Sequence, residues 1–223
     1  RPPLAGRPQL LPPELAWSYR VGHAQPATSP KGQVARGGRL VVADVAAPVA
    51  LGLPRLAPWV ADGDGEPPRL LAGADATPTR VLQALPDAAE IELHVHGLVD
   101  LAVSDASFLA LSPDADGHHA LTAGQIRGVS LPARPLVILG ACHAGQVAPY
   151  LHEAWSLPLA FLAAGARAVI ASPAPIDDRE AGPFFAGVRA RILAGSSPAV
   201  AVRDERVKLG PATPWAASVL VFE

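Results

Sequence analysis

The sequence predicts an α/β domain with a mostly parallel central sheet and helices on both faces. Short, almost wholly apolar runs recur along the chain, as expected for strands that are buried on both faces. Stretches with helical patterning separate these runs, and glycine or proline marks most boundaries. With 223 residues, the chain can bury such a core without needing a disulfide or a metal to hold it.

The first half of the chain contains three predicted strands, one helix and a hairpin. Thr77 and Pro78 open the helix, because threonine caps free N–H groups and proline suits the first helical position. The strands are residues 39–45 (RLVVADV), 69–72 and 90–96 (EIELHVH), the helix ends at residue 85, and the hairpin covers residues 98–111.

The second half alternates helices with strands more regularly. Thr122 opens its first helix, and Pro158 breaks or restarts its second. Gly165, Gly195 and Gly210 end the last three helices. The predicted helices are residues 121–129, 151–164, 180–194 and 199–209, and the predicted strands are residues 136–141 (LVILGA), 166–172 and 215–222.

Residues 1–38 differ in composition from the rest. They are rich in proline, glycine and arginine, which is typical of irregular or linker structure. We expect them to be a junction segment, with residues 14–19 packing on the core, and residues 39–223 to be the domain. The chain starts at Arg1 and has no methionine, which fits either removal of the start by processing or a chain cut from a longer protein.

Composition excludes several classes of function. Eighteen basic against 20 acidic residues give a net charge of −2, so nothing indicates direct nucleic-acid binding. No apolar run is long enough to span a membrane. No glycine-rich phosphate loop follows a strand, and no cofactor is expected. A single cysteine cannot form an internal disulfide and fits a reducing cytosol, which predicts a cytoplasmic protein.

Reactive side chains follow two of the predicted strands. One strand ends in His96-Gly97, and the other runs into Cys142. If these strands are parallel neighbours, both side chains emerge at the same sheet edge, where α/β proteins bind ligands. A cysteine nucleophile needs a base and backbone N–H donors for the oxyanion. The N–H groups of Gly97 and Cys142 are the candidate donors. The alternative is that Cys142 is only a small buried apolar residue.

These residues resemble the CHAT family of caspase-like cysteine peptidases. The resemblance covers residues 39–223 and depends on the order of several short motifs. They are Val41–Asp44, Ala76-Thr77, His96-Gly97, Leu121–Ala123, Ala141–Gly145, Ala160–Leu162, Val169–Ser172, Asp177-Asp178 and Trp215-Ala216. The departure is Cys-His-Ala-Gly at residues 142–145, where many relatives have Cys-Glu-Ser-Gly, and it falls in the loop after the nucleophile.

The resemblance implies a caspase-like fold and a thiol protease, a hydrolase with Cys142 as nucleophile and His96 as base. It also implies a protein substrate and an upstream regulatory domain or activating partner. Many such domains act in bacterial defence, including antiviral defence, or in cell-death signalling. In caspase-like folds the loop after the 166–172 strand helps to build the pocket for the residue before the cut.

Three acidic residues are candidates for that pocket. Asp177 and Asp178 follow the strand at residues 166–172, and Asp105 lies in the predicted hairpin. A carboxylate in the pocket would select arginine or lysine. The alternatives are a helix cap for Asp177 or Asp178 and a surface turn for Asp105.

Two other functions stay open at this point. A caspase-like domain can serve as an inactive docking scaffold. His94-x-His96 also resembles the first two ligands of some zinc hydrolases, although no second ligand cluster is evident. Otherwise His94 is expected to be structural, and His143 to tune the cysteine or lie in solvent. His118 and His119 sit in a polar loop and are expected to be exposed.

Overall fold

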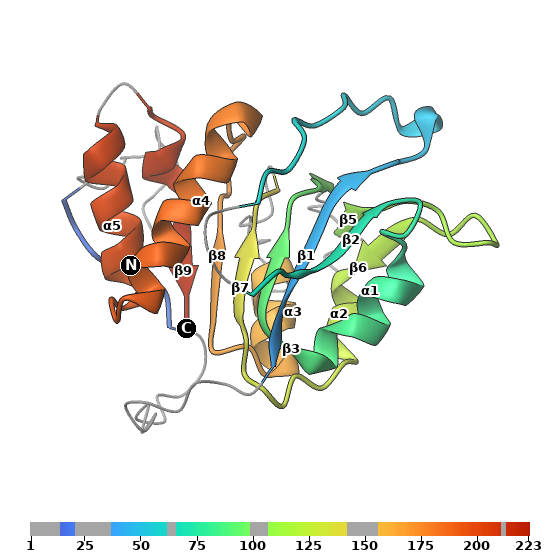
Figure 1. Ribbon diagram of the computed structural model, residues 1–223, viewed down its shortest axis with the longest axis horizontal. Helices are drawn as coiled ribbons and strands as arrows, with labels where there is room; N and C mark the ends of the chain where they lie inside the picture. Colours follow the sequence, from blue (N-terminus) through green and yellow to red (C-terminus); the bar gives the residue numbers. More distant parts are fainter. Residues whose placement is uncertain (1–13, 21–36, 62–65, 99–106, 142–155, 211–212) are drawn as a thin grey trace, which may run out of the picture.

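A six-stranded sheet runs through the centre of the protein (Figure 1). The computed structural model describes residues 14–20, 37–61, 66–98, 107–141, 156–210 and 213–223. The strands of the sheet are β1 (Gly38–Val45), β2 (Arg69–Gly73), β3 (Ala88–Leu93), β7 (Leu136–Leu139), β8 (Ala168–Ala171) and β9 (Leu220–Phe222).

The strand order is β2-β1-β3-β7-β8-β9, so the chain crosses between strands that are not consecutive. All neighbours pair in parallel except β8 and β9, which are antiparallel. The predicted mostly parallel sheet is therefore confirmed. Parallel neighbours need crossover connections. The connections from β2 to β3, β3 to β7 and β7 to β8 contain helices, while the described part of the β1–β2 connection contains only a short 3₁₀ turn.

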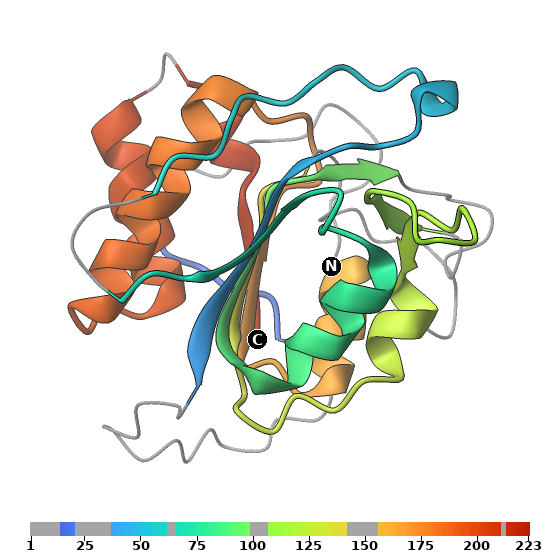
Figure 2. The same cartoon turned by 45° about the vertical axis from the view of Figure 1, so that its right-hand side comes forward.

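Helices cover both faces of the sheet (Figure 2). Three helices pack on one face with the larger apolar cluster, and two pack on the other face with a smaller one. The first group is α1 (Pro78–Ala84), α2 (Ala123–Arg127) and α3 (Leu157–Ala164), and the second is α4 (Asp178–Leu193) and α5 (Pro198–Leu209). Short 3₁₀ turns are η1 (Val49–Leu51), η2 (Leu85–Asp87) and η4 (Ala216–Ser218).

Local sequence signals set the helix starts. The Thr77 hydroxyl accepts from the Arg80 N–H, with Pro78 in the first turn. Thr122 and Gln125 form a reciprocal capping box at α2. Each cap satisfies N–H groups that have no partner inside the helix. The predicted openings at Thr77 and Thr122 are therefore confirmed.

The predicted strand at residues 90–96 was too long. β3 ends at Leu93, and His96 instead begins β4 (His96–Leu98) of a separate antiparallel sheet. That sheet also contains β5 (Phe108–Ala110) and β6 (Ala120–Thr122). Leu98 pairs with Phe108 in antiparallel orientation, as the predicted hairpin requires, and residues 99–106 between them lie outside the described residues. The alternating apolar pattern of the sequence continues past the end of β3, because Val95 is buried as well. The pattern therefore does not mark where one sheet ends and the other begins.

Two further element boundaries differ from the prediction. The strand expected at 215–222 is confined to β9, because the chain first makes the 3₁₀ turn η4, whose residues bond locally. The helix expected at 151–164 is described from Leu157, which Ser156 caps. The other predicted strands and helices are present within a few residues.

The segment before the domain contacts the last strand. The Tyr19 N–H donates to the Val221 carbonyl at 2.7 Å, and the Glu223 N–H donates to the Tyr19 carbonyl at 2.8 Å. Tyr19 also stacks on Phe222. Residues 17–19 thus pack on the sheet edge, as expected for residues 14–19. The junction at residues 1–38 and the domain at 39–223 stay predictions.

None of the described helices combines the length and the apolar character that crossing a membrane requires.

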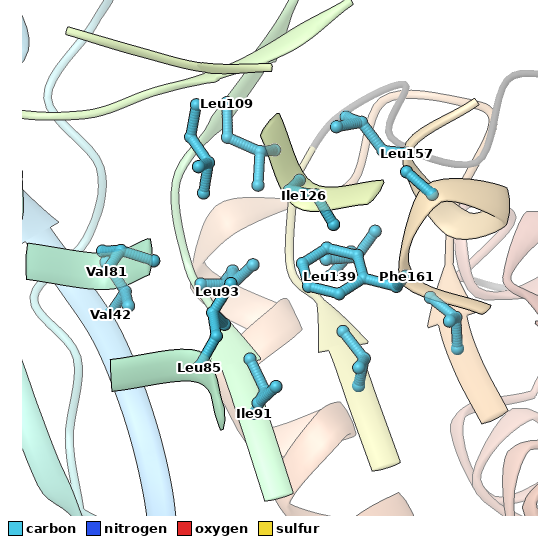
Figure 3. Packing of buried hydrophobic residues seen from close by; sticks show 14 of the residues in the cluster. Val42, Val81, Leu85, Ile91, Leu93, Leu109, Ile126, Leu139, Leu157 and Phe161 are labelled. Atoms are coloured by element: carbon cyan, nitrogen blue, oxygen red, sulfur yellow. The ribbon is translucent and has the colours of Figure 1, made fainter. Parts of the chain in front are cut away.

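Phe161 provides a stability test of this core. It is fully buried in the larger cluster with Leu139 and Ile126 (Figure 3). We expect Phe161→Ala to lower the free energy of unfolding by about 3–5 kcal/mol, because it leaves a cavity. Leu193→Ala is the control, since Leu193 is 66% exposed and should change stability by less than about 0.5 kcal/mol. Urea unfolding measures both, and equal effects would contradict the described packing.

Candidate active site

The pairing of β3 with β7 brings the two strand ends that precede the predicted catalytic residues to one edge of the sheet. The strands are parallel, and Leu93 lies opposite Leu139 at their carboxyl ends. His96 comes three residues after Leu93, and Cys142 comes three residues after Leu139. The predicted parallel neighbours are therefore confirmed. Cys142 itself lies outside the described residues.

His96 is half-buried at the start of β4. Its Nε2 lies 2.7 Å from the carbonyl oxygen of Pro54. A carbonyl oxygen only accepts hydrogen bonds, so Nε2 must carry the proton and donate. In the neutral imidazole, the other nitrogen, Nδ1, is then left as the acceptor. The contact with Pro54 thus assigns the tautomer in which Nδ1 is the basic nitrogen.

His94 lies between the two strand ends. Its Nε2 is 3.2 Å from Glu92 Oε2, and its backbone N–H donates to the Val42 carbonyl at 2.8 Å. A Cβ at Gly140 would come within 2.8 Å of His94 Nδ1. Gly140 therefore leaves the space that the imidazole occupies, two residues before Cys142. This contact places His94 beside the chain that leads to the cysteine.

Through Glu92, His94 contacts a buried network of ion pairs. Glu92 pairs with Arg39 of β1 at 2.8 Å, and both side chains are almost fully buried. Arg189 of α4 pairs with Glu90 and lies 3.8 Å from Glu92 Oε1. The network therefore joins β1, β3 and α4, and each buried carboxylate faces a guanidinium.

The pKa values of the two carboxylates in this network shift in opposite directions. Burial raises the pKa of Glu90, even though the Arg189 guanidinium opposes it. Burial also acts to raise the pKa of Glu92, but hydrogen bonds from His94 and Arg39 outweigh it and lower the pKa below its ordinary value. Glu92 is therefore the more firmly ionised of the two, and it holds His94 Nε2.

The predicted oxyanion donors are only partly described. Gly97 lies in β4 opposite Leu109 of β5, directly after His96. The second donor, Cys142, lies outside the described residues. The assignment of the oxyanion hole to these two N–H groups stays a prediction.

The predicted acidic residues are not all free. Asp177 caps α4 by accepting from the N–H groups of Arg179 and Glu180, at 2.9 and 3.3 Å, so the helix-cap alternative is confirmed for it. Asp178 accepts from the Ala57 N–H. Both carboxylates are exposed and could still meet a basic group. Asp105 lies outside the described residues.

Among the described residues, the other histidines are His118 and His119, and both lie in the loop between β5 and β6. His143 lies outside the described residues, and His118 is exposed while His119 is half-buried against Phe108. The part of the chain that the structure describes contains no group of three or more histidine, cysteine, aspartate or glutamate side chains able to hold a metal. His94 and His96 each direct Nε2 at a different partner.

Sequence reasoning missed two parts of the site. The Pro54 carbonyl is a backbone group in an irregular loop, and no side-chain pattern points to it. Glu92 had a readable signal, because Glu90 and Glu92 place two acids on one face of a strand predicted to be buried. A buried strand with acids on one face requires cationic partners from elsewhere in the fold.

Comparisons with known proteins identify the family and the fold. The family model for the CHAT domain matches residues 20–221. The fold is caspase-like: it is similar to a complex of Porphyromonas gingivalis RgpB pro- and mature domains, with TM-score 0.52, 12% identity, and 85% of this chain and 47% of that one covered. It is also similar to the Arg-specific cysteine proteinase gingipain R, with TM-score 0.51, 11% identity, and 82% and 45% covered.

The chain thus spans about half the length of these two structures. None of the curated proteins compared with the sequence matches it.

The lowered pKa of Glu92 predicts a pH-dependent stability. We expect Glu92→Gln to lower the free energy of unfolding at neutral pH by about 1–3 kcal/mol, because Arg39 and His94 lose a charged acceptor. The stabilisation from a lowered carboxylate pKa is present above the unfolded pKa and disappears as the pH falls through the folded one. The difference between wild type and variant should therefore shrink in acid.

Urea unfolding across that pH range measures the difference. Glu66→Gln is the matched control, because Glu66 is exposed and its replacement should leave stability unchanged at every pH. A Glu92→Gln effect that stays constant from neutral to acidic pH would contradict the assignment.

Proposed function

The chain belongs to the CHAT family, and we propose that it is a cysteine endopeptidase that cleaves a protein partner through Cys142 and His96. The observation that carries the proposal is the parallel register of β3 and β7, whose last paired residues, Leu93 and Leu139, lie opposite each other at one edge of the sheet. His96 and Cys142 each follow three residues later in the sequence. The tautomer assigned by the Pro54 carbonyl adds support, because it leaves a basic nitrogen on the histidine.

In the proposed reaction, His96 Nδ1 takes the proton of the Cys142 thiol. The thiolate attacks the scissile carbonyl carbon, and the N–H groups of Gly97 and Cys142 stabilise the oxyanion. The imidazolium then gives its proton to the leaving amine as the C–N bond breaks, which leaves a thioester. Water gives a proton to His96 and attacks the thioester, so the acid product leaves and the proton returns to the thiol sulfur.

The Pro54 carbonyl has a defined part in this cycle. It accepts from Nε2–H both when the ring is neutral and when it is protonated, so the ring keeps its orientation while Nδ1 gains and loses the proton. A second, fixed partner of this kind is what a catalytic histidine needs to act as base and acid in turn.

We propose that the residue before the cleaved bond is arginine or lysine. Asp177 and Asp178 support this, because their exposed carboxylates lie after β8 at the carboxyl edge of the sheet. Asp105 is a further candidate. The structural neighbour gingipain R is Arg-specific, although a likeness at 11% identity concerns the fold alone.

The proposed setting is a bacterial defence or cell-death system in the cytoplasm. In this setting an upstream regulatory domain or an activating partner would control cleavage, as the family resemblance implies. A scaffold that binds partners without cleaving them remains the competing function, and labelling of the thiol separates the two.

We expect Cys142→Ala to abolish cleavage of a fluorogenic peptide library. His96→Ala should slow cleavage by about 10²–10⁴-fold, the usual contribution of a general acid–base. An iodoacetamide probe should label Cys142 in wild type faster than a free thiol, because the thiolate is the reactive species. His118→Ala is the control, since His118 is exposed in the loop between β5 and β6. Cleavage by Cys142→Ala, or labelling at the rate of a free thiol, would refute the peptidase proposal.

The same library tests the pocket. We expect peptides with arginine or lysine before the cleaved bond to be cut preferentially, because exposed carboxylates form charge-assisted hydrogen bonds with them. Asp177→Asn should reduce that preference, because it removes the charge and keeps an oxygen that can cap the helix. A preference for acidic or apolar residues would contradict the assigned pocket and leave the peptidase activity itself intact.

A further inference from the structure

A segment of irregular chain passes beside His96 and is held at three points. The clamp segment, residues 54–59, runs from η1 toward α4 across the carboxyl edge of the sheet (Figure 1). Its Pro54 carbonyl accepts from His96 Nε2 at 2.7 Å. Its Ala57 N–H donates to the Asp178 carboxylate, and its Trp59 N–H donates to Asp44 Oδ1 at 3.1 Å.

The two aspartates that hold the clamp segment belong to firmly placed elements. Asp178 is the first residue of α4, whose Phe184 and Phe185 are fully buried in the smaller apolar cluster. Asp44 lies at the bulge near the end of β1, with φ of 51°. That left-handed conformation is uncommon for a residue other than glycine. Trp59 is held further by the Arg39 guanidinium, 5.7 Å from the ring centroid.

The geometry couples Asp178 to the histidine. Ala57 is only three residues from Pro54. When Ala57 is fixed, the Pro54 carbonyl must therefore lie within about 10 Å of it. Pro54 has a fixed φ and Pro58 restricts Ala57, which removes much of the freedom of the chain between them. The helix terminus, the clamp segment and the imidazole therefore form one continuous chain of contacts.

We propose that Asp178 is a positioning residue for His96, acting through the Ala57 N–H and the Pro54 carbonyl to fix the imidazole in its Nε2–H tautomer. This inference rests on the proposed function for its catalytic meaning, since only a histidine acting as base needs Nδ1 free. It gives Asp178 a role that does not require contact with the substrate.

Release of the clamp segment has a defined chemical result. Without the Pro54 carbonyl, the neutral imidazole has no fixed acceptor at Nε2 and distributes its proton over both nitrogens. The fraction with a proton on Nδ1 cannot accept one from the thiol. The chemical step then slows, while contacts with the substrate away from His96 remain. The signature of a positioning role is therefore a lower kcat with little change in KM.

The first test needs no substrate. The tautomer of His96 is read from ¹⁵N-edited NMR of its imidazole in the full chain at a pH where the ring is neutral, with the signals assigned by their loss in His96→Gln. We expect the Nε2–H tautomer in wild type and a mixture in Asp178→Ala. Asp178→Asn should restore the wild-type tautomer, because the amide oxygen still accepts from Ala57. An unchanged tautomer in Asp178→Ala would overturn the inference.

The matched control is Asp116→Ala. Asp116 also accepts a backbone N–H, from His118 at 3.1 Å, but it lies in the β5–β6 loop at the other end of the molecule from α4 (Figures 1 and 2). It should leave the His96 tautomer as in wild type. Thermal unfolding of each variant confirms that it is folded before the spectra are compared.

The second test measures catalysis. We expect Asp178→Ala to lower kcat by about tenfold, which is less than the 10²–10⁴-fold contribution of the general base itself, and Asp178→Asn to restore it. If Asp178 instead acted only by binding a basic substrate, Asp178→Asn would raise KM and restore nothing, which would overturn the inference. Absence of both cleavage and thiol labelling in wild type would contradict the proposed function only. The NMR measurement of the tautomer would still decide whether Asp178 positions the ring.

Discussion

The parallel pairing of β3 with β7 at the centre of the sheet is the constraint on which the site depends. Parallel strands end at the same edge, so whatever the chain places after each strand meets there. Leu93 and Leu139 fix that register, and apolar helices on both faces hold the two strands in place. The second sheet begins only after this edge, and it carries His96 away from the central sheet while keeping it near the strand end. A slip of register would separate the histidine from the chain that follows β7.

Polar groups rather than apolar ones fill the space beneath this edge. On the face of the sheet that carries α4 and α5, the apolar cluster involves β7, β8 and β9, while β3 presents Glu90 and Glu92. Arg39 and Arg189 neutralise these acids, so the desolvation of each charge is offset by a partner within the fold. His94 completes the network and occupies the space that Gly140 leaves. Charge neutralisation and close packing thus act together where the strands end.

The sheet could be predicted because apolar runs and helix caps are local signals. The strand end at Leu93 could not, because His94 still bonds to β1 and Val95 is still buried, so the alternating pattern crosses the break without changing. That the strands before His96 and before Cys142 are parallel neighbours could be predicted, because both are apolar runs that end in reactive side chains, and the pairing of β3 with β7 confirms it. The Pro54 carbonyl could not, because a backbone acceptor carries no residue type. Contacts that depend on where a loop crosses the fold cannot be predicted from a single sequence.

The bonds between Tyr19 and the last strand join parts of the chain that are far apart in sequence; the nearby Ser18–Glu223 pair is separated by 205 residues. Contacts of such long range form late, because closing a long loop costs entropy before any contact compensates for it. During synthesis, the central strands can pair while the segment around Tyr19 has no partner, since Val221 has not yet left the ribosome. The outer edge of the sheet is therefore the last part to close, and it leaves strand β8 with an open neighbouring position until the whole domain has emerged.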